Sequence, residues 1–154
     1  MCGPTDVLGA RILIVDDQDS NIRLLEYTLR RRGYVAVSST NDSVEVSALH
    51  RQNCYDLIML DVQMPRMNGL DVLKGLRGLD EHNDVAVLVL TADPDQVVRA
   101  MESGATGFLS KPFVLPEVLL CVGLMLEKAL QLHRHLGHRV AEPEAMKDRL
   151  RRFV

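Results

Sequence analysis

Acidic, hydroxyl and basic side chains follow four short apolar runs in this chain. The Asp16–Asp17 pair follows ILIV, Asp61 follows YDLIML, Thr91 follows VAVLVL, and Lys111 follows GFLS. Short runs rich in Val, Ile and Leu are typical of strands buried on both faces of a parallel sheet. Ligands of an open parallel sheet bind beyond the carboxyl ends of its strands. The spacing therefore predicts that these side chains meet at one sheet edge and form a site for a cation and a phosphoryl group.

The residue types at this predicted edge indicate which chemistry is available. Carboxylates that crowd together repel one another unless a cation offsets their charge, and ligation by oxygen alone favours a hard cation such as Mg²⁺. Asp61 is the best candidate nucleophile, because a carboxylate can attack phosphorus and form an acyl phosphate. Lys111 would supply a positive charge and Thr91 a hydroxyl hydrogen bond to phosphoryl oxygens.

Taken singly, each of these residues has an ordinary structural explanation. An Asp pair commonly lies in a turn or helix cap, Thr91 would cap a helix that begins in ADPDQ, and Lys111 would be a solvated surface lysine. The joint pattern of all of them, each at the end of an apolar run, favours the functional interpretation.

The elements that must position these residues alternate along the chain. We expect strands at 12–15, 34–38, 56–60, 85–90 and 107–110. We expect helices at about 20–32, 70–79 and 95–103, and a long last helix from near 116 to 136. A further helix is expected to start between positions 41 and 43 and to end near 52. Asp19 or Ser20 would cap the first helix, Gly33 would end it, and Gly137 is a plausible end for the last one. Strand–helix units in series imply a doubly wound α/β fold with helices on both faces of the sheet.

Length, charge and cysteine content bound the class of protein. The 154 residues suit one domain with an extension. Residues 1–127 carry 11 Lys and Arg against 18 Asp and Glu, whereas residues 128–154 carry 7 against 3, so an acidic body precedes a basic tail. The scattered Cys2, Cys54 and Cys121 argue for a reducing cytoplasm and against a disulfide framework or zinc site. No signal peptide is visible, and the longest apolar stretch, 118–126, is too short to span a membrane.

Four separated motifs make the chain similar to a known family. ILIVDD at 12–17, LIMLDVQMPRMNG ending at Gly69, VLTA at 89–92 and FLSKPF at 108–113 agree in order and spacing with the response regulator receiver domain. The resemblance covers about residues 10–128 and leaves 129–154 as a helical, basic extension or linker. It implies a flavodoxin-like α/β fold, with a five-stranded parallel sheet in the order 2-1-3-4-5, five helices and an extended last helix.

The resemblance also implies a role for each site residue. Asp61 corresponds to the aspartate that accepts a phosphoryl group from a sensor histidine kinase or a phosphotransfer protein. The implied Mg²⁺ ligands are Asp17, Asp61, the backbone carbonyl of Gln63, and Asp16 acting mainly through a metal-bound water. Thr91 and Lys111 correspond to the pair that senses the phosphate, and a cis peptide bond is implied before Pro112. The side chains of Gln63 and Asp93 stand where the family tunes phosphoryl lifetime, and Asp93 would either repel an incoming anion or hold a water.

Several alternatives stay open at this point. Phe108 is either the aromatic residue of the switch or an ordinary core residue. The last helix has one apolar stripe at 122, 126, 129 and 130 and a second at 120, 124, 125 and 132. The second would pair with another copy or an output domain, or be a buried helix edge. The basic tail, including a weak helix at 143–153, is a solvated linker more often than a nucleic-acid contact.

The output is also open. The chain is expected to be a signalling domain without an enzymatic turnover of its own, acting on an unidentified effector. It would be either a stand-alone switch or a receiver cut from a longer chain, whose output would be an enzyme such as a cyclic-dinucleotide phosphodiesterase or cyclase. The ending RLRRFV resembles an interrupted helical linker and favours the second. A phosphohydrolase is disfavoured, because such enzymes usually need an acid where Gln63 stands.

Overall fold

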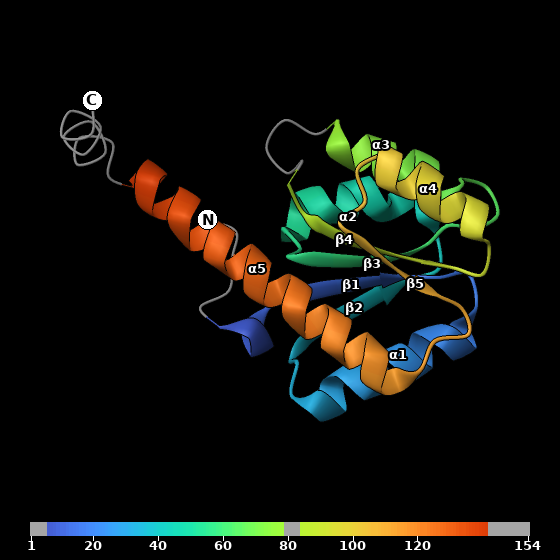
Figure 1. Cartoon of the computed structure of the whole chain (residues 1–154), viewed down its shortest axis with the longest axis horizontal. Helices are drawn as coiled ribbons and strands as arrows, with labels where there is room; N and C mark the ends of the chain where they lie inside the picture. Colours follow the sequence, from blue (N-terminus) through green and yellow to red (C-terminus); the bar gives the residue numbers. More distant parts are fainter. Residues whose placement is uncertain (1–5, 79–83, 142–154) are drawn as a thin grey trace.

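The computed structural model describes residues 6–78 and 84–141, with side chains described as far as Leu132 in the last helix. A five-stranded sheet lies at the centre, with all strands parallel and in the order β2-β1-β3-β4-β5 (Figure 1). The strands are β1 (Arg11–Val15), β2 (Ala36–Thr40), β3 (Leu57–Asp61), β4 (Ala86–Thr91) and β5 (Gly107–Ser110). The α-helices are α1 (Asp19–Arg32), α2 (Val46–Asn53), α3 (Gly69–Arg77), α4 (Pro94–Glu102) and α5 (Leu115–Ala141). The fold class, strand order and five helices predicted from the sequence are confirmed.

The helices form a layer on each face of the sheet. Helices α1 and α5 lie on one face, and α2, α3 and α4 lie on the other (Figure 1). Alternate residues of the central strands supply the two resulting cores: Ile12 and Ile14 pack toward α1 and α5, and Leu13 and Val15 pack toward α2 and α3. This alternation follows from the period of two along a strand. It explains why the strands read as continuous apolar runs in the sequence.

Two predicted boundaries at the start of the chain are wrong. Strand β2 begins two residues later than expected, because the backbone amides of Tyr34 and Val35 bond to Leu29 and Leu8 and not to β1. The side chain of Asp19 does not cap α1, whose N-cap residue is Gln18 with no capping side chain. The predicted end of α1 is confirmed, since Gly33 takes a φ of 116°, which is left-handed and favours glycine.

The segment between β2 and α2 also differs from the prediction. The α-helix starts at Val46, after the 3₁₀ helix η2 (Ser43–Glu45). The side chain of Asp42 caps this 3₁₀ turn by accepting a hydrogen bond from the amide of Val44 at 3.1 Å. Local hydrogen bonding between a side chain and the backbone competes with α-helix formation. The α-helix therefore begins further along the chain than predicted.

Helix α5 continues past the end of the sheet (Figure 1). It includes position 137, so Gly137 does not end it as predicted, and it crosses the proposed boundary at 128–129 without interruption. Val118, Val122, Leu126 and Leu130 form its buried stripe. Leu120, Leu124 and Leu132 are exposed, so they do not form a buried helix edge. The predicted helix at 143–153 and the basic residues from Lys147 onward lie outside the described residues.

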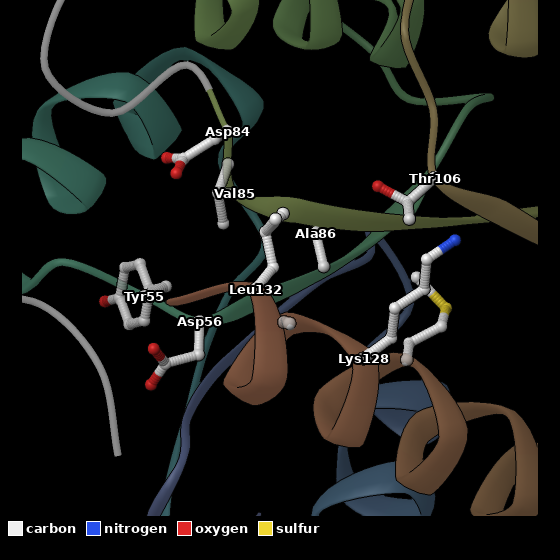
Figure 2. A pocket seen from close by; sticks show the side chains of 10 residues that line it. Tyr55, Asp56, Asp84, Val85, Ala86, Thr106, Lys128 and Leu132 are labelled. Atoms are coloured by element: carbon white, nitrogen blue, oxygen red, sulfur yellow. The ribbon is translucent and has the colours of Figure 1, made fainter. Parts of the chain in front are cut away.

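A small hollow of about 140 Å³ lies beside α5 at the amino ends of β3 and β4. Lys128 and Leu132 of α5 face Asp84, Val85 and Ala86 across it (Figure 2). It lies at the opposite end of the strands from the predicted site residues, none of which lines it.

One cysteine departs from the expectation. Cys54 is disulfide-bonded, whereas Cys121 is free. A disulfide needs two sulfur atoms that are close in space, not close in sequence, which is why the scattered spacing gave no sign of it. Within the described residues, no helix is both long enough and apolar enough to cross a membrane.

Candidate functional site

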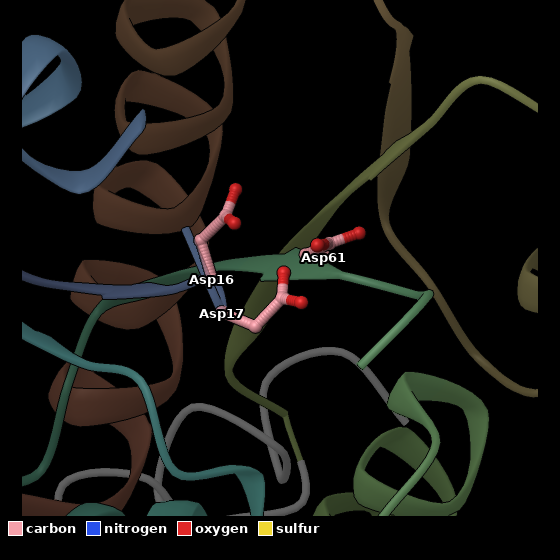
Figure 3. Close-up of side chains that lie close together, drawn as sticks. All are labelled: Asp16, Asp17 and Asp61. Atoms are coloured by element: carbon pink, nitrogen blue, oxygen red, sulfur yellow. The ribbon is translucent and has the colours of Figure 1, made fainter. Parts of the chain in front are cut away.

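The predicted site residues do meet at the carboxyl edge of the sheet. Asp16 and Asp17 follow β1, Asp61 is the last residue of β3, Thr91 is the last of β4, and Lys111 directly follows β5. Figure 3 shows the carboxylates of Asp16, Asp17 and Asp61 gathered where β1 and β3 end. One oxygen from each of the three lies within 4.8 Å of the others.

Burial and charge make this cluster unusual for acidic residues. Asp16 is fully buried and Asp61 is 4% exposed, whereas Asp17 is exposed to solvent. The ammonium Nζ of Lys111 lies 3.4 Å from Asp16 Oδ2 and 3.5 Å from Asp61 Oδ2. Asp16 also accepts hydrogen bonds from the amide of Gln18 at 2.9 Å and from Nδ2 of Asn21 at 3.3 Å. A single lysine therefore faces two buried carboxylates.

The pKa of Asp61 reflects this environment. The pKa is raised from 3.8 to about 6, and burial is the largest cause. The Lys111 ammonium and the hydrogen bond from the Gln63 amide lower the pKa, whereas the Asp16 and Asp17 carboxylates raise it. The negative charge is therefore only partly compensated by the protein. A set of oxygen donors with uncompensated negative charge fits a hard divalent cation such as Mg²⁺.

The loop that follows β3 is built around Gly69. A Cβ atom at this position would lie 2.5 Å from the carbonyl oxygen of Asp61 and 2.6 Å from Cα of Val62. The amide of Gly69 donates to the carbonyl of Val62 at 2.9 Å, and the amide of Gln63 donates to Asp61 Oδ1 at 3.1 Å. This close approach was not predicted from the sequence, although the glycine at the end of the MPRMNG motif was the available signal.

The end of β4 connects the site to α4. The hydroxyl Oγ1 of Thr91 accepts a hydrogen bond from the amide of Asp93 at 3.0 Å. The carboxylate of Asp93 in turn caps α4 by accepting from the amide of Asp95 at 2.9 Å. Thr91 is therefore not the cap of this helix, and Asp93 has a structural task that sequence analysis did not foresee.

The residues around β5 also have defined positions. Phe108 is 44% exposed, which does not fit the alternative of a core-packing residue. The amide of Lys111 donates to the carbonyl of Thr91 at 2.8 Å, so β4 and β5 deliver these two residues to one place. The peptide bond between Lys111 and Pro112 is cis, as predicted.

Comparison with known proteins identifies the family. The model of the response regulator receiver domain matches residues 12–122, which is most of the chain. The chain belongs to this family. As a receiver domain, it has the phospho-accepting role of two-component signalling.

Relatives and solved structures agree with this identification. The receiver is 38% identical over 126 residues to the transcriptional regulatory protein PrrA of Mycobacterium tuberculosis, and 36% identical over 123 residues to the response regulator MprA of the same species. These matches cover 80% and 79% of this chain but 53% and 52% of those proteins, so the chain spans about half the length of these relatives. The Vibrio cholerae chemotaxis protein CheY4 has a similar structure, with a TM-score of 0.71, 31% identity, and coverage of 76% of this chain and 98% of CheY4.

A further solved structure bears on the metal. The receiver domain of the sensor histidine kinase PA1611 from Pseudomonas aeruginosa, described with a magnesium ion in its active-site cleft, matches with a TM-score of 0.71 and 26% identity over 77% of this chain and 98% of that one. Receiver domains bind Mg²⁺ at an acidic pocket and interact with histidine kinases. The curated relatives are transcriptional and response regulators, so an output enzyme such as a cyclase is not favoured.

Proposed function

We propose that Asp61 is the residue of this receiver that accepts the phosphoryl group. The observation that carries the proposal is the position of its carboxylate at the end of β3, beside the Asp16 carboxylate and 3.5 Å from the Lys111 ammonium. The ionised carboxylate would attack phosphorus in line with the leaving group, forming an aspartyl phosphate. Lys111 would then balance the charge of the phosphoryl oxygens.

We propose that Asp17, Asp61, the backbone carbonyl of Gln63, and Asp16 through a water hold the Mg²⁺ ion. When bound, the ion would neutralise charge on the phosphoryl oxygens. The protein's own contribution is to orient its ligands. The Gln63 amide holds Asp61 Oδ1 at 3.1 Å, and the Gln18 amide and Asn21 hold Asp16.

The proposed switch starts with Thr91 and Lys111. Phosphorylation adds a charge of about −1.5 to −2 at the sheet edge, and both residues are drawn to it. Thr91 would give up its bond from the Asp93 amide, and the start of α4 would shift. The strand β5, which carries the exposed Phe108, packs against α4, so the surface of α4, β5 and α5 would change shape.

A small acyl-phosphate donor such as acetyl phosphate tests the nucleophile. The wild-type receiver should gain one phosphoryl group in the presence of Mg²⁺, seen as an added mass in intact-protein mass spectrometry. Asp61→Asn should gain none, and Asp71→Asn, which removes an exposed carboxylate on α3, should behave as wild type. Phosphate on Asp61→Asn at the wild-type level would show that the nucleophile is another residue.

A histidine kinase or a phosphotransfer protein is the proposed donor in the cell. A hollow of about 460 Å³ beside the site, lined by Asn21, Leu24, Ala92, Lys111, Pro112 and Phe113, would receive the donor's surface. Leu24 is 43% exposed there. Leu24→Arg should slow transfer from a protein donor more than tenfold and leave transfer from acetyl phosphate unchanged. Equal slowing of both would contradict docking at this hollow.

The output is proposed to be a partner or a further domain that reads this surface. The exposed Leu120 and Leu124 on α5 support either an output contact or a homodimer through the last helix. Several sequence-based expectations stay predictions: the domain division at 128–129, the linker role of the tail, a cytoplasmic location and the lack of nucleic-acid binding. Light scattering of the wild type and of the double variant Leu120→Ser/Leu124→Ser, each with and without beryllofluoride, tests the homodimer. The homodimer proposal is refuted if the wild type stays a monomer with and without beryllofluoride.

A further inference from the structure

The loop between the proposed phosphoacceptor and α3 contains a strained turn at Arg66. Its φ is +69°, in the left-handed region that residues with a β-carbon rarely adopt. The amide of Met67 donates to the carbonyl of Pro65 at 2.8 Å, across a single intervening residue. A bond of this span with a positive φ in the middle is the rare and strained form of the γ-turn. Such strain persists only where surrounding contacts hold the backbone in place.

The contacts that hold this turn come from the segment after β2. Nη1 of Arg66 lies 3.0 Å from Oδ2 of Asp42, and the hydroxyl of the buried Ser43 lies 3.5 Å from the carbonyl of Pro65. Asp42 is itself fixed, since its other oxygen accepts from the Val44 amide and its amide donates to Oγ1 of Thr40 at 3.0 Å. The ion pair therefore joins the strained turn to a rigid anchor 24 residues earlier in the chain.

The other end of the loop is fixed at the site. Gln63 bonds to Asp61, and Gly69 bonds back to Val62 with no room for a side chain. Only two residues, Met64 and Pro65, separate Arg66 from the proposed ligand Gln63 along this constrained loop. A change in the turn at Arg66 would therefore be expected to shift the Gln63 carbonyl.

We propose that the Arg66–Asp42 ion pair is a positioning pair that sets the Mg²⁺ affinity of the receiver by holding the β3–α3 loop. This inference rests on the proposed roles of Asp61 and Gln63. Because the two side chains are 67% and 30% exposed, the effect is modest, about twofold to fivefold in affinity. Positioning and simple electrostatics make opposite predictions for Arg66→Ala. If the arginine positions the loop, its loss weakens Mg²⁺ binding; if it acts only as a positive charge near the cation site, its loss strengthens Mg²⁺ binding.

The experiment is a Mg²⁺ titration of the wild type, Asp42→Asn, Arg66→Ala and the double variant by isothermal calorimetry. Asparagine still caps the 3₁₀ turn, so Asp42→Asn removes the charge and keeps the cap. Each single variant should bind Mg²⁺ about twofold to fivefold more weakly, and the double variant should be no weaker than the weaker single one. Arg66→Lys, which retains the charge, should stay within twofold of wild type. Lys74→Ala, which removes an exposed positive charge on α3, is the matched control.

Two outcomes would overturn the inference. If Arg66→Ala binds Mg²⁺ more tightly than wild type, the arginine acts only through its charge; if all variants bind equally, the ion pair positions nothing. Failure of the proposed function is a separate result, since acetyl phosphate would then leave no phosphoryl group on Asp61 whatever the metal affinity. Phosphate on Asp61 together with unchanged Mg²⁺ affinity in the variants refutes the positioning role alone.

Discussion

Replacing Asp61 by asparagine should stabilise the metal-free receiver at neutral pH. The pKa of this carboxyl is about 6 in the folded protein, against an ordinary value of 3.8 in solvent, mainly because of burial. A group whose pKa is raised on folding binds its proton more tightly in the folded state, so stability is lost as the pH rises from about 4 to 6. Above pH 6 the ionised carboxylate destabilises the fold, and Asp61→Asn removes that charge.

The size of the effect follows from the shift in pKa. About 1.4 kcal/mol per pKa unit gives a destabilisation of about 3 kcal/mol at pH 7.5, and about half of that at pH 5. Asp61 is 4% exposed, so solvent screens little of this cost. The Lys111 ammonium is already included among the causes of the shift, and its attraction does not offset the burial.

Urea unfolding in EDTA at pH 7.5 and pH 5 measures the effect. The free energy of unfolding of Asp61→Asn should exceed that of wild type by about 2–3 kcal/mol at pH 7.5, and the gap should shrink by about half at pH 5. Asp71→Asn, at an exposed position on α3, should show no such pH-dependent gap. Mg²⁺ at a hundredfold excess over its dissociation constant should stabilise the wild type by about 2.7 kcal/mol, and the variant by less. Equal stabilities at pH 7.5, or a gap that does not change with pH, would refute the reasoning.

Three further predictions concern the neighbours of Asp61. Gly69→Ala should lower the free energy of unfolding by about 1–3 kcal/mol, because its methyl group would lie 2.5 Å from a backbone oxygen. Gly75→Ala should not destabilise α3, because the nearest atom to its methyl group would be 3.4 Å away. Urea titration checks both variants. Asp93→Ala should cost about 1 kcal/mol of stability and Asp93→Asn much less, because only the first loses the cap of α4. Lys111→Met should raise the pKa of Asp61 above about 6, measured by carboxyl NMR without metal; a lower pKa would mean that Lys111 does not act on this carboxylate.

The positions of the site residues could be predicted because parallel strands convert sequence into geometry. Each of Asp16, Asp61, Thr91 and Lys111 ends an apolar run, and adjacent parallel strands in register bring such ends to one edge. Burial on both faces makes the runs easy to recognise. The strand order itself rested on resemblance to a family and not on the pattern.

The boundary of β2 could not be predicted in this way. Tyr34 is buried and Val35 is 73% exposed, so an apolar pair that reads as the start of a strand is in fact a connection that crosses from α1 to the sheet. Its backbone bonds go to Leu29 and Leu8, and the partner Leu8 comes from a segment before β1. Periodicity describes a side chain's local pattern and does not identify the partner of a backbone amide. For the same reason, the ion pair between Arg66 and Asp42 left no sign in the sequence.

Asp93 shows how a residue that sequence analysis left open gains a role from its neighbours. Its amide is held by the Thr91 hydroxyl, and its carboxylate holds the first turn of α4. Under the proposed switch, the Thr91 hydroxyl turns to the phosphoryl group, and the Asp93 amide loses its acceptor. Because one residue carries both bonds, the loss on one side changes the geometry of the helix cap on the other. Two consecutive hydrogen bonds therefore connect Thr91 to α4. The proposed switch can reach that helix through these two bonds alone.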